Sequence, residues 1–248
     1  MSTFPCALVL TGMHRSGTSL IARFLKMSGV DMGEVLLGED PSNPYGHFED
    51  LEILNFHLRV LGREFQGEQQ WVPRPPRITE DDRCVATAFI ARRRGKGHPW
   101  GWKEPRTCLF LNFWAELLPE AKFLFVFRHP WLVVNSLARR HSVSTNDREL
   151  HNRFLAAWIL YNGEICRFYA KHRDCSVIFS LDSCIERPHQ WVRLLVARLG
   201  YPFIERSFAE SYDSSVLRLD PKLAGDTSVY LRMRASWVYR RLLALSQI

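Results

Sequence analysis

The sequence predicts an α/β fold in which helices flank a parallel β-sheet, built as a single domain with helical insertions. Three observations predict it. Short apolar runs alternate with segments of helical periodicity through most of the chain. The run at residues 122–127 is almost entirely apolar, as in a central parallel strand covered on both faces. Residues 8–25 join an apolar run, a glycine-containing loop and a helical pattern, which is the layout of a phosphate-binding loop (P-loop).

The expected elements follow one another along the chain. Strands are predicted at residues 7–10, 100–103, 122–127 and 176–181, and helices at residues 18–25, 51–61, 78–94, 107–118, 131–140, 152–169, 188–199 and 229–245. The segments 29–43, 62–76 and 141–147 are rich in polar residues, glycine or proline and are predicted as loops.

Local signals support several of these boundaries. Glu49 and Asp50 stand where acidic side chains favour the start of a helix, and the arginines at 92–94 stand where basic side chains favour its end. The arginines at 92–94 therefore need no ligand to explain them. Pro105 ends the strand at 100–103, because proline lacks the N–H that strand pairing requires. Gly200 closes the helix at 188–199.

Composition limits the classes of function. A chain of 248 residues with 46% apolar and 24% charged residues suits one globular domain, here taken as residues 1–248 with a C-terminal helical extension at 210–248. No apolar run reaches the roughly 18 residues of a membrane span, and no secretion signal is recognisable. We therefore expect a cytoplasmic protein, or a chain from which a targeting segment has been removed. The net charge of +7 favours anionic partners without choosing among nucleotides, nucleic acid, acidic glycans and anionic membrane.

The six cysteines show neither a CxxC pair nor zinc-ligand spacing, so we expect reduced thiols and no metal.

The loop after the first strand departs from the Walker pattern G-x-x-x-x-G-K-S/T. Gly12 and Gly17 stand five residues apart and Ser19 takes the hydroxyl position, but Thr18 replaces the lysine and Arg15 supplies the loop's cation. Backbone N–H groups and the helix dipole can still hold an anion there, and an arginine can donate to two oxygens of a phosphate or sulfate. The loop therefore favours an anchored 5′-phosphate over a magnesium-bound triphosphate.

A second cationic strand end lies at Arg128. Ser136 stands eight residues after it, in the second turn of the predicted helix, so the two side chains could hold another phosphate. Carboxyl ends of parallel strands share one edge of a sheet, so residues 12–19, 103–106 and 128–130 should converge there. Two anion sites at one edge indicate a nucleotide that is phosphorylated at two places.

These motifs resemble those of sulfotransferases that use 3′-phosphoadenosine-5′-phosphosulfate (PAPS). Residues 12–19 resemble the family's 5′-phosphosulfate loop, P-K/R-S/A-G-T-S/T, and residues 125–130 with Ser136 resemble its 3′-phosphate motif. Residues 102–106 resemble the family's K-x-P strand end, and the similarity extends over about residues 7–200. The resemblance implies a single sulfotransferase-like α/β domain that transfers a sulfuryl group to a hydroxyl of a carbohydrate or other small molecule, without metal and without a nucleic-acid partner.

The resemblance also implies roles for individual residues. Arg15 would contact the phosphosulfate and stabilise the bridging oxygen, and Lys103 would contact the transferred sulfuryl group. The 3′-phosphate would lie on Arg128 and Ser136. The remaining loop residues would bind the donor, which leaves as PAP: His14, Ser16, Gly17, Thr18 and Ser19.

The general base is less defined by the sequence. Many cytosolic members place a histidine two residues after the strand-end lysine, but Pro105 occupies that position here. Glu49 is the first candidate, as in branches that use a glutamate after the first helix, and His47 and Glu34 follow. Glu49 could instead cap a helix, and Lys103 and Arg106 could instead pair with Glu104.

Two other functions remain open at this point. One is a P-loop NTP-dependent kinase or NTPase, which the missing lysine disfavours. The other is a non-catalytic relative that binds nucleotide or an anionic glycan. Residues 181–184 read Leu-Asp-Ser-Cys where the family often has Tyr-Glu-Asp-Leu, so the adenine contacts are not assigned.

Overall fold

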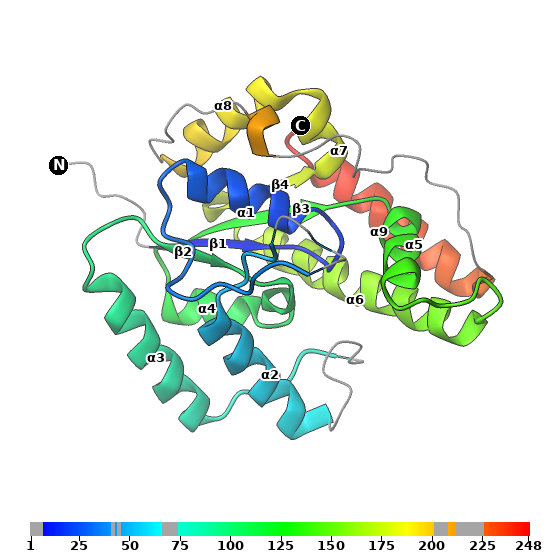
Figure 1. Ribbon diagram of the computed structural model, residues 1–248, viewed down its shortest axis with the longest axis horizontal. Coiled ribbons are helices and arrows are strands. Elements are labelled where there is room, and N and C mark those ends of the chain that lie inside the picture. The colour runs from blue at the N-terminus through cyan, green and yellow to red at the C-terminus, as the bar shows by residue number, and fades with distance from the viewer. Residues whose placement is uncertain (1–6, 41–42, 44–45, 66–73, 201–207, 212–225) are drawn as a thin grey trace.

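The computed structural model describes residues 7–40, 43, 46–65, 74–200, 208–211 and 226–248 (Figure 1). Its centre is a parallel sheet of four strands in the order β2-β1-β3-β4. The strands are β1 (Leu8–Thr11), β2 (Gly101–Lys103), β3 (Lys122–Phe127) and β4 (Ser176–Ser180). In the register of the sheet, Leu10 lies opposite Lys103 on one side and Leu124 on the other. The predicted α/β architecture, a parallel sheet flanked by helices, is confirmed.

Helices pack on both faces of this sheet (Figure 1). They are α1 (Thr18–Met27), α2 (Leu51–Phe65), α3 (Glu80–Arg94), α4 (Leu111–Leu117), α5 (Pro130–Arg140), α6 (Arg148–Lys171), α7 (Leu181–Glu186), α8 (Pro188–Leu199) and α9 (Val229–Leu245). Three short 3₁₀ helices are also described: η1 (Pro105–Leu109), η2 (Arg173–Cys175) and η3 (Phe208–Ser211).

Alternating side chains of the strands build two hydrophobic cores. Leu8, Leu10 and Val126 point to the face covered by α1, α7 and α8, and they pack with the buried Trp191 of α8. The neighbouring residues in each strand, such as Phe125 beside Val126, point to the other face and pack with α4, α6 and α9. This period of two explains why β3 reads as a continuous apolar run, since both of its faces are buried.

Several element boundaries differ from those that the sequence predicts. The expected helix at 107–118 divides into η1 and α4, because Thr11 Oγ1 hydrogen-bonds to the carbonyl oxygens of Glu104 and Pro105 and holds the chain in a tight turn against β1. The strand expected to reach Leu181 ends at Ser180, whose hydroxyl caps α7 by accepting from Ser183 N.

Two helices extend furthest beyond their predicted bounds. α6 begins at Arg148 because Asp147 accepts a hydrogen bond from Leu150 N, and α2 continues to Phe65 through part of the segment that the sequence analysis assigns to a loop. Residues 66–73 of that predicted loop lie outside the described residues.

The cysteines at 84, 108, 166, 175 and 184 carry free thiols, while Cys6 lies outside the described part of the chain. Within that part, none of the helices combines the length and the apolar character that crossing a bilayer requires.

The strand order sets the place of a ligand site. The chain passes from β1 to β2 on one side of β1 and then crosses back to β3 on its other side, so the direction of winding reverses at β1. In open parallel sheets this switch leaves a crevice outside the carboxyl ends of the strands. The loops after β1, β2 and β3 all begin at this edge.

Candidate active site

The loop after β1 packs so closely that it requires glycine at two positions. A Cβ on Gly12 would lie 2.1 Å from the carbonyl oxygen of Val126 in β3. Gly17 has a φ of 89° and faces the side chain of Leu181. α1 begins immediately afterwards at Thr18, with no acidic residue in its first turn. The loop therefore presents the positive end of a helix dipole at the carboxyl edge of the sheet.

Ser16 supports an anion site within this loop. Its hydroxyl is fully buried, and Ser16 Oγ has no hydrogen-bond partner in the described structure. A buried polar atom without a partner is costly, and an anionic oxygen at the loop would satisfy it. The residues present therefore fit a bound phosphate.

Arg15 connects this loop to the second predicted anion motif. Its Nε donates a hydrogen bond to Ser136 Oγ at 2.9 Å, across a sequence separation of 121 residues. The Arg15 backbone has a φ of 67°, in the left-handed region that non-glycine residues seldom adopt. Burial, followed by repulsion from Arg140 and Arg139, lowers the pKa of the Arg15 guanidinium. The two motifs thus meet at a site of concentrated positive charge.

Arg128 lies at the end of β3 in the same region and is only 7% exposed. Burial lowers the pKa of its guanidinium, with Asp182 opposing the shift and Arg139 adding to it. Arg140 pairs with Asp40 at 3.1 Å. Negative charge bound among these arginines would relieve their mutual repulsion.

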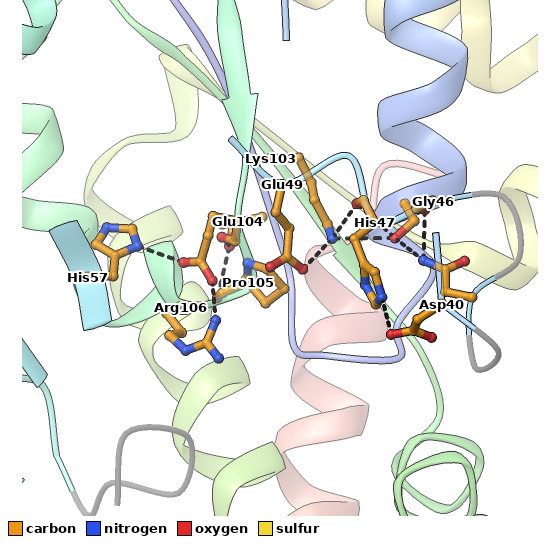
Figure 2. A network of polar contacts seen from close by, with 12 residues as sticks. Asp40, Gly46, His47, Glu49, His57, Lys103, Glu104, Pro105 and Arg106 are labelled. Carbon is orange, nitrogen blue, oxygen red and sulfur yellow. Dashed lines mark hydrogen bonds and ion pairs between the residues drawn. The ribbon is translucent and has the colours of Figure 1, made fainter. Parts of the chain in front are cut away.

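Lys103 ends β2 and is 1% exposed (Figure 2). Its Nζ donates to Glu49 Oε1 at 2.8 Å, to the His47 carbonyl oxygen at 3.0 Å and to Ser19 Oγ at 3.3 Å. Asn43 Nδ2 also donates to Ser19 Oγ, at 3.2 Å. A lysine at a strand end, a carboxylate and the first turn of α1 are thereby brought into contact.

Glu49 precedes α2 without capping it. Asp50 does so instead, since its Oδ1 accepts from Glu52 N at 2.9 Å while its other carboxylate oxygen binds Arg93. Glu49 is 5% exposed and pairs with Lys103. The carboxylate is therefore available to the site and not committed to the helix.

The other two candidate bases lie in different surroundings. The His47 ring hydrogen-bonds through Nε2 to Asp40 Oδ2 at 2.7 Å, and its carbonyl oxygen accepts from Lys103. Glu34 is an exposed residue that pairs with Lys96 beyond the end of α3. Glu49 is thus the candidate whose carboxylate contacts Lys103.

Glu104 forms a second buried network on the opposite side of the strand end (Figure 2). Its Oε2 contacts His57 Nδ1 at 2.6 Å and its Oε1 accepts from Arg106 Nη1 at 2.6 Å. Trp114 Nε1 donates to His57 Nε2 at 3.0 Å, so the imidazole proton sits on Nδ1 and points to Glu104. Arg106 therefore pairs with Glu104, whereas Lys103 takes Glu49.

These contacts set the charges of the network. Burial raises the pKa of Glu104, but Arg106 and the hydrogen bond from His57 outweigh it and lower the pKa to about 2. Burial lowers the pKa of His57, against the effect of Glu104. The result is a carboxylate anion between a guanidinium and a neutral imidazole.

His14 adds a neutral ring to the loop. Burial, followed by the charge of Arg106, holds the pKa of His14 well below its ordinary value. Its Nε2 is buried and has no hydrogen-bond partner among the described residues. The ring lies 6.0 Å from that of Tyr161, measured between centroids.

Sequence reasoning missed several members of the site. Asp40 and Asn43 lie in a segment without a recognisable motif, and Asp182 lies where the sequence departs from the family pattern. Arg139 and Arg140 read as ordinary basic residues at the end of a helix. Asn43 is identified only by its contact with Ser19, and Asp40 by its contact with Arg140. The other three are identified by their charge interactions with Arg15 or Arg128.

The model of a family described as the sulfotransferase family matches residues 7–205. No curated protein matches the sequence.

Several solved structures share the fold. Sulfotransferase STF9 from Mycobacterium avium aligns with a TM-score of 0.60 and 13% identity, covering 100% of this chain and 78% of that one. A sulfotransferase from Alicyclobacillus acidocaldarius aligns with a TM-score of 0.55 and 17% identity, covering 99% and 96%. The sulfotransferase domain of the Synechococcus PCC 7002 olefin synthase gives 0.53 and 18%, covering 94% of each.

The family model spans most of the chain and includes the loop after β1, the ends of β2 and β3, and Ser136. The chain belongs to the sulfotransferase family.

Proposed function

We propose that this protein transfers a sulfuryl group from PAPS to a hydroxyl of a small-molecule or carbohydrate acceptor. The observation that carries this proposal is the hydrogen bond between Arg15 Nε and Ser136 Oγ. It places the loop suited to a 5′-phosphate beside the motif suited to a 3′-phosphate, and a nucleotide phosphorylated at both positions would bridge the two.

The donor would supply an activated sulfuryl group joined to its 5′-phosphate. Ser16, Thr18 and the backbone N–H groups at the start of α1 would bind that phosphate, with Gly17 allowing the approach. Arg15 would stabilise charge on the bridging oxygen. Arg128 and Ser136 would hold the 3′-phosphate. His14 and Ser19 would also contact the donor, as further residues of the loop.

Lys103 and Glu49 have complementary roles. The Lys103 ammonium would stabilise negative charge on the sulfuryl oxygens, because sulfuryl transfer depends mainly on positioning and on neutralising charge in the transition state. The Glu49 carboxylate would accept the proton of the acceptor hydroxyl. Their contact at 2.8 Å supports the proposal, because a cation for the sulfuryl oxygens and a base for the acceptor hydroxyl would act at neighbouring points.

Donor binding is tested by titration calorimetry with PAP in the absence of magnesium. We expect micromolar or tighter binding, weakened by at least about 1 kcal/mol in Arg128→Ala. Arg193→Ala on α8, which removes an exposed arginine, is the matched control and should bind PAP unchanged. Failure of PAP to bind would refute the proposed donor, and binding of ATP that magnesium strengthens would favour an NTPase.

Catalysis is tested by transfer of labelled sulfate from PAPS to a panel of acceptors. Glu49→Gln should lower the rate roughly 100- to 10,000-fold while PAP affinity is kept, since a general base contributes about that much. His47→Ala and Glu34→Gln test the other candidate bases. If either variant lowers the transfer rate more than Glu49→Gln does, that residue is the general base. PAP binding without transfer to any acceptor would indicate a non-catalytic relative.

A further inference from the structure

A stripe of apolar side chains is exposed along α9. Tyr230, Met233 and Trp237 are 62%, 69% and 61% exposed, and their spacing of three and four residues places them on one side of the helix. We call these three residues the α9 stripe. Five of the eight most exposed large apolar side chains in the described residues belong to this one helix. Such a concentration is unusual on a solvated surface.

Arginines border the α9 stripe. The guanidinium of Arg234 lies 5.7 Å from the centroid of the Tyr230 ring, and that of Arg241 lies 5.6 Å from the Trp237 ring. With Arg232 and Arg240, α9 carries four arginines and no acidic residue. The helix therefore combines apolar anchors with a positive charge that no acid on the helix offsets.

The opposite side of α9 is fixed in the core. Ala235, Val238 and Leu242 are buried in the core that includes α6, so the α9 stripe faces away from the fold. Tyr239 lies against His129, with ring centroids 4.7 Å apart, and His129 caps α5, the helix that carries Ser136. α9 thus packs beside α5, which carries a residue of the candidate active site (Figure 1).

We propose that the α9 stripe binds the surface of a bilayer that contains anionic lipids. A helix with arginines beside exposed tryptophan, tyrosine and methionine can lie in the plane of the interface, with its apolar side chains among the headgroups and upper acyl chains. Arg234 Nη1 donates to the Tyr230 hydroxyl at 3.0 Å, and the other N–H groups of Arg234, with those of Arg241, could donate to lipid phosphates. The positive charge of α9 is complementary to such a surface.

Other occupants fit the same features less well. Single-stranded nucleic acid would stack bases on open aromatic faces, but Arg234 and Arg241 each cover one face of the ring beside them. A second copy of this chain, packed α9 against α9, would bring together two sets of four arginines with no acid on either helix. A bilayer avoids both difficulties.

The test is co-sedimentation of the full chain with vesicles of phosphatidylcholine alone or with 30% phosphatidylserine, at low and high salt. We expect binding to the anionic vesicles only, weakened by salt. Met233→Ser/Trp237→Ser should lower the partition coefficient about tenfold or more through lost apolar burial. Arg234→Gln/Arg241→Gln should lower it roughly 25-fold, at about fivefold per arginine.

A matched control changes the same kinds of residue on another helix. Arg193→Gln/Val196→Ser alters an exposed arginine and an exposed valine of α8 and should bind vesicles like the wild type. Unchanged thermal midpoints and PAP affinity in every variant would separate vesicle binding from folding and from the proposed donor site.

Three outcomes would overturn the proposal. The first is no sedimentation with anionic vesicles, or equal binding by the α9 variants. The second is a dimer in analytical ultracentrifugation that the α9 variants dissociate. The third is tight binding of a single-stranded oligonucleotide that the same variants abolish. PAP binding is measured separately, so failure of the proposed function would not be mistaken for failure of the membrane surface.

Discussion

A buried lysine or arginine needs a negative partner. This site supplies two carboxylates, one on each side of the end of β2. Lys103 takes Glu49, and Arg106 takes Glu104. Breaking a buried pair by removing one partner is costly, because the remaining charge stays in a poorly solvating environment. Lys103 therefore lies against the start of α1, where it contacts Ser19. Arg106 is held away from that loop by Glu104, two residues before it in the chain.

Glu104→Gln is expected to lower the free energy of unfolding by about 3 kcal/mol, because Arg106 would remain buried without its counterion. Chemical denaturation with urea measures this change. Glu104→Gln/Arg106→Met should recover much of the loss, since it removes the stranded charge. A double variant as unstable as the sum of the single variants would contradict the pairing.

Stability should fall as the pH drops below about 6.5. The folded pKa values of His14 and His57 lie below the ordinary value of 6.5, chiefly through burial, so the unfolded chain binds more protons there and acid favours unfolding. Each histidine contributes up to about 1.4 kcal/mol of loss at pH 5.5. Glu104, with its lowered pKa, adds to the loss only below pH 4.5.

Denaturation curves at pH 7.5 and 5.5 measure the effect of the histidines. In His57→Gln the difference between the two pH values should shrink, since one titrating group is gone. An unchanged difference in that variant would show that His57 does not contribute.

At the scale of elements, the unit formed by β1, its loop and α1 is fixed by packing against β3. Gly12 lies against the backbone of Val126, and a backbone atom cannot move aside as a flexible side chain can. The Walker-like spacing of the glycines thus has two causes: close approach at Gly12 and a left-handed φ at Gly17.

Gly12→Ala should lower the free energy of unfolding by about 1–3 kcal/mol and weaken PAP binding, because the end of β1 must move away from β3. Gly95→Ala is the control. Gly95 has a φ of −62° and its nearest neighbours to an added Cβ lie at 3.5 Å, so this change should be neutral or slightly stabilising. Urea denaturation and calorimetry with PAP compare the two variants, and equal losses in both would contradict the packing argument.

For the molecule as a whole, the site brings together arginines from three segments. Arg15 comes from the loop after β1, Arg128 from the end of β3, and Arg139 and Arg140 from the last turn of α5. Like charges at close range oppose the folded state, so an anionic ligand stabilises the fold as well as the site.

PAP at 100 times its dissociation constant should raise the unfolding free energy by about 2.7 kcal/mol, which corresponds to a rise in Tm of roughly 5–11 °C for a chain of this size. Thermal scans with and without magnesium measure the shift, which should not depend on the metal. Adenosine, which lacks both phosphates, serves as the control and should leave Tm unchanged. A shift that appears only with magnesium would argue against the proposed donor.

The fold was predictable from the sequence because strand and helix periodicities are local. The four strands, the glycine loop and most helices follow from the spacing of apolar residues, and the sheet confirms them. The short helix α7 and the division of η1 from α4 were not predicted, because hydrogen bonds from Ser180 and Thr11 decide them. Thr11 acts across more than 90 residues, which no local pattern can report.

The sequence by itself determined which residues are the candidates for the chemistry: Arg15, Lys103, Arg128 and Ser136 stand in motifs whose spacing is read along the chain. Only the tertiary structure decided how they pair. Glu49 meets Lys103 and Arg15 meets Ser136 across separations of 54 and 121 residues. The physical reason is that parallel strands bring their carboxyl ends to one edge, while the partner each buried charge takes depends on side-chain packing at that edge.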